Sequence, residues 1–232
     1  MLMREKLLFG LGGLGALWLL RNLYVILLQL PDESAQGAIY RIMFFHIPSW
    51  FTCFTGFFLA GVSSILYLVK KKPGYDTFAV ATVEVGVAFT IIGLVTGMIW
   101  ARIIWGIWWT WDARLTWAFI TCLIYAGYLM MRNAIDEPTA RARYAAVLCI
   151  FAFTSVVITF KAIEWWRTQH PGPVLSIRTG GGKMDPAMES ILYQNWYALL
   201  LLAAVMTAVR MRQEGVQREV ESLRRQVHAS AA

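Results

Sequence analysis

Charged residues are scarce in this sequence, at 15% of its 232 positions, whereas hydrophobic residues make up 58%. The mean hydropathy is +0.55. A soluble domain of this length cannot bury that much apolar surface. The composition therefore excludes an ordinary soluble protein and predicts a polytopic membrane protein.

Cysteine is scarce as well, with three residues, Cys53, Cys122 and Cys149, each inside an apolar run. They form no C-x-x-C pair, which argues against a disulfide framework and against a cysteine metal site. The chain also lacks C-x-x-C-H, so nothing in it attaches haem covalently through thioethers. We expect all three to be small core residues.

Motifs for catalysis and nucleotide binding are missing too. The Gly-rich run at 176–186, SIRTGGGKMDP, contains GGGK but lacks the spacing of a phosphate-binding P-loop. We therefore expect this chain not to be an enzyme.

Six apolar runs are long enough to cross a bilayer, and their backbone polar groups must be satisfied within each segment. The predicted fold is therefore all-α, a bundle of six transmembrane helices. The predicted spans are 7–30, 47–69, 77–100, 115–131, 144–163 and 191–209.

The distribution of Lys and Arg predicts the orientation. Thirteen of these residues fall on the side of both termini and seven on the other, which places both termini in the cytoplasm. This bias accounts for the net charge of +7, and nothing supports a nucleic-acid partner. We expect residues 1–212 to form the membrane domain and 213–232 a cytoplasmic tail, either amphipathic or frayed.

The tryptophans are concentrated in 105–117, WGIWWTWDARLTW, on the outer side. A plain interfacial belt is one interpretation, and a flat apolar surface for a flat ligand is the other. If the stretch is helical, Trp105, Trp108, Trp109 and Asp112 share one face, and Gly106 leaves room for close approach. Asp112 and Arg114 form either a local ion pair or direct ligand contacts.

Two histidines lie on the same outer side, His46 at the start of the second span and His170 just after the fifth, whereas His228 lies in the polar tail. Imidazole is a ligand of iron, copper and zinc, and a haem takes up to two axial nitrogens. Zinc would need further ligands, and no such cluster is visible in the sequence. Arg41 and Arg114 are candidates to meet a haem propionate, with Arg178 and Lys183 as weaker alternatives.

WGIWWTWDARLTW resembles the tryptophan-rich WWD signature of haem-handling membrane proteins. Its DARLT ending is most similar to the haem exporter protein C family, also called cytochrome c maturation protein C. YRIMFFHIP, IGLVTGMIWARIIWG, EWWRTQH and MDPAMES are further segments similar to that family. The resemblance extends to about residue 212.

The resemblance implies a six-span protein of the bacterial inner membrane that presents haem b at its periplasmic face. His46 and His170 match the axial positions. The positions that match the porphyrin-contacting signature are Trp105, Gly106, Trp108, Trp109, Trp111 and Asp112. The partners implied are an ABC-type ATPase subunit, a second membrane subunit, a small single-span subunit and the periplasmic haem chaperone CcmE.

The sequence thus predicts a protein that binds haem and hands it to a chaperone for c-type cytochrome biogenesis. A membrane b-type cytochrome and a transporter subunit without a haem site remain as alternatives. Glu84, within the third span, is the best feature for the transporter, because a carboxylate inside a membrane is a functional candidate. We favour pairing with another helix or the interface for Glu84.

Overall fold

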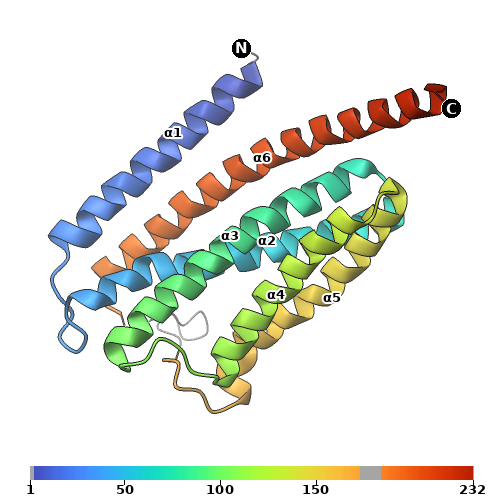
Figure 1. Cartoon of the computed structure of the whole chain (residues 1–232). Coiled ribbons are helices and arrows are strands. Elements are labelled where there is room, and N and C mark those ends of the chain that lie inside the picture. The colour runs from blue at the N-terminus through green and yellow to red at the C-terminus, as the bar shows by residue number, and fades with distance from the viewer. Residues whose placement is uncertain (1–2, 173–183, 232) are drawn as a thin grey trace.

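The computed structural model describes residues 3–172 and 184–231, and within these ranges six helices are long and apolar enough to cross a membrane. The predicted all-α, six-span architecture is confirmed, and both termini lie at the same end of the bundle (Figure 1). That this end faces the cytoplasm stays a prediction. The helices are α1 (Met3–Tyr24), α2 (Met43–Lys70), α3 (Pro73–Ile104), α4 (Ala113–Ala134), α5 (Pro138–Trp165) and α6 (Pro186–Ala231).

The ends of the helices follow from local sequence signals. Pro73 and Pro138 stand in the first turn of α3 and α5, where a missing N–H costs nothing. Lys71 ends α2 in the left-handed conformation, with φ 54°. Two short helices complete the connection between α1 and α2, a π-helix at Val25–Gln29 and a 3-10 helix at Ala38–Ile42.

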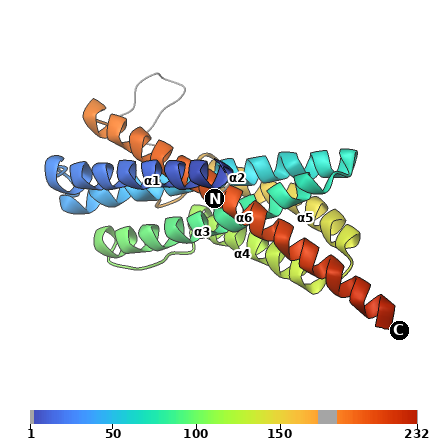
Figure 2. The same cartoon turned by 90° about the horizontal axis from the view of Figure 1, so that it is seen from above.

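The helices pack as sequential pairs, α2 with α3 and α4 with α5, while α1 packs along α6. Seen from above, α6 crosses the other helices at an angle, and its C-terminal end projects beyond them (Figure 2). Residues 213–231 continue α6 without a break. Five of the six predicted spans lie inside longer helices, because helical geometry does not stop where the apolar run stops. The first, 7–30, extends past the end of α1 at Tyr24 through the π-helix Val25–Gln29.

Glycines of α3 let the large rings of α2 approach closely. A Cβ at Gly86 would lie 2.7 Å from the Phe57 ring, and one at Gly93 would lie 2.8 Å from the Trp50 ring. Small residues at a helix interface allow the backbones to come near each other. This seam between α2 and α3 runs up to the end of the bundle that carries the tryptophans.

Several charged side chains on the helices form ion pairs with another helix. Arg132 donates two hydrogen bonds to Asp76, at 2.7 and 3.0 Å, and Arg218 of α6 donates to the same carboxylate. Glu84 accepts from Arg210 of α6 at 2.5 and 2.7 Å. The pairing that we favoured for Glu84 is therefore confirmed.

Candidate functional site

His46 lies in the first turns of α2 and is held from below by α3. A Cβ at Gly97 would lie 2.9 Å from His46 Cε1, so glycine is what admits the imidazole at this position. His46 Nδ1 lies 3.1 Å from Thr96 Oγ1, and that hydroxyl donates to the Ile92 carbonyl at 2.7 Å. Because the hydroxyl proton is used there, Nδ1 of His46 is the donor, and Nε2 keeps its lone pair.

Pro48 adds a second constraint on this part of α2. It has no N–H, so the carbonyl of Phe44, one turn earlier, loses its helical partner. Asn195 of α6 replaces it by donating to that carbonyl at 2.5 Å. The helix therefore continues through Pro48, and His46 sits on a segment tied to α6.

His170 lies in the loop after α5. Its Nδ1 is 2.8 Å from the Pro171 carbonyl, and since a carbonyl only accepts, Nδ1 carries the proton and Nε2 the lone pair. Burial, and then the cation of Arg114, lower the pKa of His170 to about 4, so the ring is neutral at neutral pH. Its ring centroid lies 6.4 Å from that of His46, at an interplanar angle of 28°.

The tryptophan stretch is a loop, so the helical arrangement in which Trp105, Trp108, Trp109 and Asp112 would share one face is not formed. α3 ends at Ile104, and Gly106 follows with φ +77°, a conformation that glycine adopts readily and that commonly ends a helix. Arg102 donates to the Gly106 carbonyl and closes the turn.

Some tryptophans of the loop are exposed on the surface, and others pack against neighbouring aromatic side chains. Trp108 and Trp111 are 54% and 72% exposed. Trp109 is packed edge-on against Trp111 and against Phe119 of α4, with ring centroids 5.7 and 6.0 Å apart. Trp105 packs edge-on against Trp100. The loop therefore offers an apolar surface that is anchored on α4.

Asp112 joins this loop to the loop of His170. One carboxylate oxygen accepts from the Leu115 N–H at 3.0 Å and caps α4, while the other accepts from Thr168 Oγ1 at 2.8 Å and from the Gln169 N–H at 3.1 Å. The N–H of His170 donates to the same Thr168 hydroxyl at 3.1 Å. The hydrogen bonds of Asp112 thus go to the backbone and to Thr168, in place of the ion pair with Arg114 that we considered.

The two arginines expected at a propionate lie in different places. Arg114 donates to the carbonyls of Thr159 and Phe160 at 3.3 and 3.4 Å, near the end of α5. Arg41 donates to the Ile26 and Leu30 carbonyls and to Asp32, and so holds the connection between α1 and α2.

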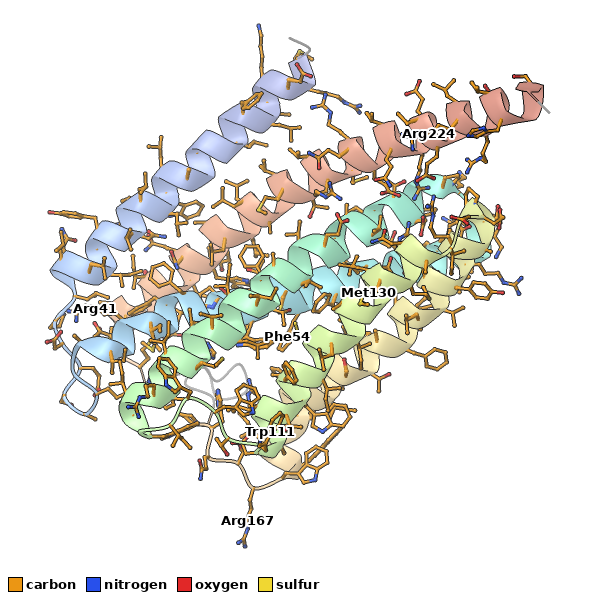
Figure 3. All side chains as sticks on the ribbon, in the orientation of Figure 1. Arg41, Phe54, Trp111, Met130, Arg167 and Arg224 are labelled. Atoms are coloured by element: carbon orange, nitrogen blue, oxygen red, sulfur yellow. The ribbon has the colours of Figure 1, made fainter. Side chains whose placement is uncertain are left out.

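Figure 3 shows Arg41 at the α1–α2 connection and Trp111 beside the start of α4, on separate parts of this end of the bundle. The cation of Arg114 lowers the pKa of His170, which indicates that this guanidinium lies near the His170 ring. Arg178 and Lys183 lie outside the described residues. His228 lies in the α6 tail and is exposed.

Thr96, Gly97 and Thr168 are the residues of this site that the sequence analysis missed. Gly97 and Gly93 are spaced like small residues at a helix interface, which is the signal that points to a close contact there. Thr96 and Thr168 act through hydrogen bonds to residues 50 and 56 positions away, and no local pattern announces such bonds.

A family model described as Heme exporter protein C matches residues 1–226. The chain belongs to the heme exporter protein C family. Relatives with this name include the protein of Bradyrhizobium diazoefficiens, which is 37% identical over 194 residues, 83% of this chain and 73% of the relative. The protein of Escherichia coli K12 is 32% identical over 182 residues, 78% of this chain and 73% of its own. The protein of Paracoccus denitrificans is 30% identical over 194 residues, which are 83% of this chain and 80% of the relative.

As a member of this family, the chain has a role in haem export for cytochrome c maturation, and it is a transport and maturation subunit. The family name also indicates an ABC-type exporter complex. Together with the six apolar helices, membership makes the chain a multi-pass membrane protein that handles haem.

Proposed function

We propose that this protein holds haem b at the periplasmic face of the bacterial inner membrane, between His46 and His170, and passes it to the periplasmic chaperone CcmE. The haem is transient cargo in this proposal. The observation that carries it is the pairing of the two imidazoles, which come from different elements and present ring centroids 6.4 Å apart.

This spacing suits one iron between two rings. Metal–imidazole bonds of about 2 Å on opposite sides of a metal place the ring centres about 6 Å apart. Both rings are held by hydrogen bonds at Nδ1, which leaves Nε2 of each as the ligand atom. Two imidazoles supply two ligands, and a porphyrin brings the other four.

The surroundings fit a porphyrin as well. Trp108 and Trp111 offer exposed aromatic surface on the loop that Asp112 joins to the His170 loop, and aromatic faces bury apolar rings effectively. Among the described residues, Trp109 Nε1 and Thr116 Oγ1 are buried polar atoms without a hydrogen-bond partner, which is a feature of sites where a ligand completes the pairing.

In the proposed mechanism the residues of this chain hold and release, and they make or break no covalent bond of the porphyrin. His46 and His170 bind the iron, the Trp loop covers one part of the ring, and Arg114 is the better placed arginine for a propionate. The exposed edge would face CcmE. Energy for export would come from the ABC-type ATPase subunit, which with a second membrane subunit and a small single-span subunit completes the proposed complex.

The test is the absorption spectrum and pyridine haemochrome of the protein purified in detergent, for wild type, His46→Ala and His170→Ala. We expect b-type haem in wild type, with reduced content or altered ligation in both variants. His228→Ala is the matched control, because His228 is exposed in the tail, and it should match wild type. Unchanged spectra in both site variants would remove the axial pair from the proposal.

The same measurements separate the alternative functions. A haem that stays bound and cycles reversibly with a quinone would favour a membrane cytochrome. A wild type without haem, even with CcmE co-expressed, would favour a transporter subunit. The main sequence feature for that subunit was Glu84, whose pairing with Arg210 now gives it a structural explanation.

A further inference from the structure

An apolar groove lies between α2 and α3 at the end of the bundle opposite the tryptophans. Its volume is about 440 Å³. Leu59 and Val62 in its wall are 41% and 39% exposed, so the groove opens toward the surrounding lipid. The residues that line it are Leu59, Val62, Ser63, Leu66, Lys72, Gly74, Tyr75 and Phe78.

Positive charge gathers at one end of this groove. Lys72 lines it, and Lys70 Nζ lies 5.7 Å from the centroid of the Tyr75 ring, which also lines it. The Lys71 ammonium lies instead over the ring of Tyr67, 5.9 Å away, which is not part of the wall.

These lysines differ from the arginines near the same end. Among the described residues, Lys70, Lys71 and Lys72 have no carboxylate oxygen within 4.0 Å. Arg132 and Arg218 are bound to Asp76, and Arg141 is bound to Glu221 at 2.8 Å. The charge at the mouth of the groove is therefore not neutralised by the protein.

The backbone adds donors at the same point. α3 begins here, with Lys72 as its N-cap and no side chain capping the first turn. The N–H of Gly74, which lines the groove, is one of the helix-initial donors that lack a helical partner. Such N–H groups and the helix dipole favour a phosphate.

We propose that this groove binds one anionic phospholipid, with its phosphate at Lys70, Lys72 and the start of α3, and an acyl chain along the apolar wall. The charge distribution predicts that this turn is on the cytoplasmic side, where basic pockets between membrane helices meet anionic headgroups. A second apolar groove of about 260 Å³ shares Leu59 and Phe78 with the first and extends between α2, α3 and α6. This second groove offers the acyl chain a path toward the middle of the bilayer.

The combination of charge and apolar lining identifies the ligand class. A free phosphate would satisfy the lysines and leave the apolar wall unused, while a neutral lipid would fill the wall and leave two ammonium groups without a counter-charge. Only an amphiphile with a negative headgroup matches both parts of the site.

The test uses the full chain in detergent and measures thermal stabilisation by added phosphatidylglycerol, phosphatidylcholine or glycerol phosphate. Lys70→Gln/Lys72→Gln removes the charge, and Val62→Trp fills the groove without changing charge. Lys71→Gln is the matched control, since it removes one positive charge from the same turn at a side chain that does not line the groove. We expect phosphatidylglycerol to stabilise wild type and Lys71→Gln, with half-saturation needing about tenfold more lipid in the other two variants.

Several results would overturn the proposal. Equal stabilisation by phosphatidylcholine would show that a negative net charge is not required. Full stabilisation by glycerol phosphate would show that no acyl chain in the groove is required. A loss in Lys71→Gln as large as that in the double variant would indicate general surface charge. The haem spectrum of these variants should match wild type, so the outcome is independent of the haem site.

Discussion

Asp112 carries three hydrogen bonds, and its replacement by Asn removes two of them selectively. The Asn side-chain oxygen can still cap α4 by accepting from the Leu115 N–H. Its NH₂ group then faces the Gln169 N–H and the Thr168 hydroxyl, which both donated to Asp112 Oδ2. Donor meets donor at Gln169, and Thr168 keeps a bond only by turning its hydroxyl to accept. The variant therefore frees the His170 loop while it leaves α4 capped.

The size of the effect follows from those bonds. A hydrogen bond to a charged acceptor contributes about 1.5–3 kcal/mol, and Asp112 is half-buried, so the lower figure applies to each of the two. Losing one or two such bonds removes about 1.5–3 kcal/mol of loop preorganisation. This lowers the population that presents His170 correctly, and apparent affinity falls with that population. We expect haem binding weaker by about tenfold to a hundredfold.

The assay is a haem titration followed by absorption, which reports affinity and iron ligation together. Asp185→Asn is the matched control, because Asp185 accepts from the Ala187 N–H at the start of α6 at 2.8 Å and has no bond to the His170 loop among those described. Thr168→Val should lower haem affinity in the same way, whereas Thr168→Ser, which keeps the hydroxyl, should bind haem as wild type does. Combining Asp112→Asn with Thr168→Val should add little, since both break one chain of hydrogen bonds. Full affinity and unchanged ligation in Asp112→Asn would refute the reasoning.

Two further predictions concern the packing around His46 and the buried ion pair of Arg132 with Asp76. Gly97→Ala places a Cβ about 2.9 Å from His46 Cε1, so we expect a displaced imidazole and haem affinity lower by about tenfold in the same titration. Arg132→Ala leaves the buried Asp76 with Arg218 as its remaining cation, and we expect the free energy of unfolding in detergent to fall by about 3 kcal/mol.

Each of these has a control within the chain. Gly61 of α2 has nothing within 4 Å of an added Cβ, so Gly61→Ala should bind haem normally, and an equal loss there would indicate a general effect on the helices. Lys161 forms a half-exposed pair with Glu164, so Lys161→Ala should change stability by about 0.5 kcal/mol at most. A similarly small change in Arg132→Ala would contradict the importance of the buried pair.

The spans were predictable because each apolar run is a local signal that the bilayer makes obligatory. The residues at which the helices end were harder to predict. α6 continues to Ala231 through a polar sequence, where Arg218 and Glu221 hold the tail to Asp76 and Arg141. Hydropathy does not register bonds of that kind.

The tryptophan loop shows where helical periodicity alone does not predict the structure. Trp105, Trp108, Trp109 and Asp112 fit a helical face, but Gly106 interrupts the helix directly after Trp105. Glycine in a helical pattern is also a common C-cap. Reading Gly106 as that signal, together with Asp112 as an N-cap, would have predicted a loop between two helices.

The two histidines illustrate what the sequence leaves open. Both lie at span ends, where a segment can move to release a cargo. The structure distinguishes them, because His46 is seated on Gly97 in a helix tied to α6, while His170 stands on a loop held through Asp112 and Thr168. A loop held by a few hydrogen bonds opens at lower cost than a packed helix. In the proposed site, movement of His170 is therefore the less costly route to release, and Asp112 is the residue that sets its cost.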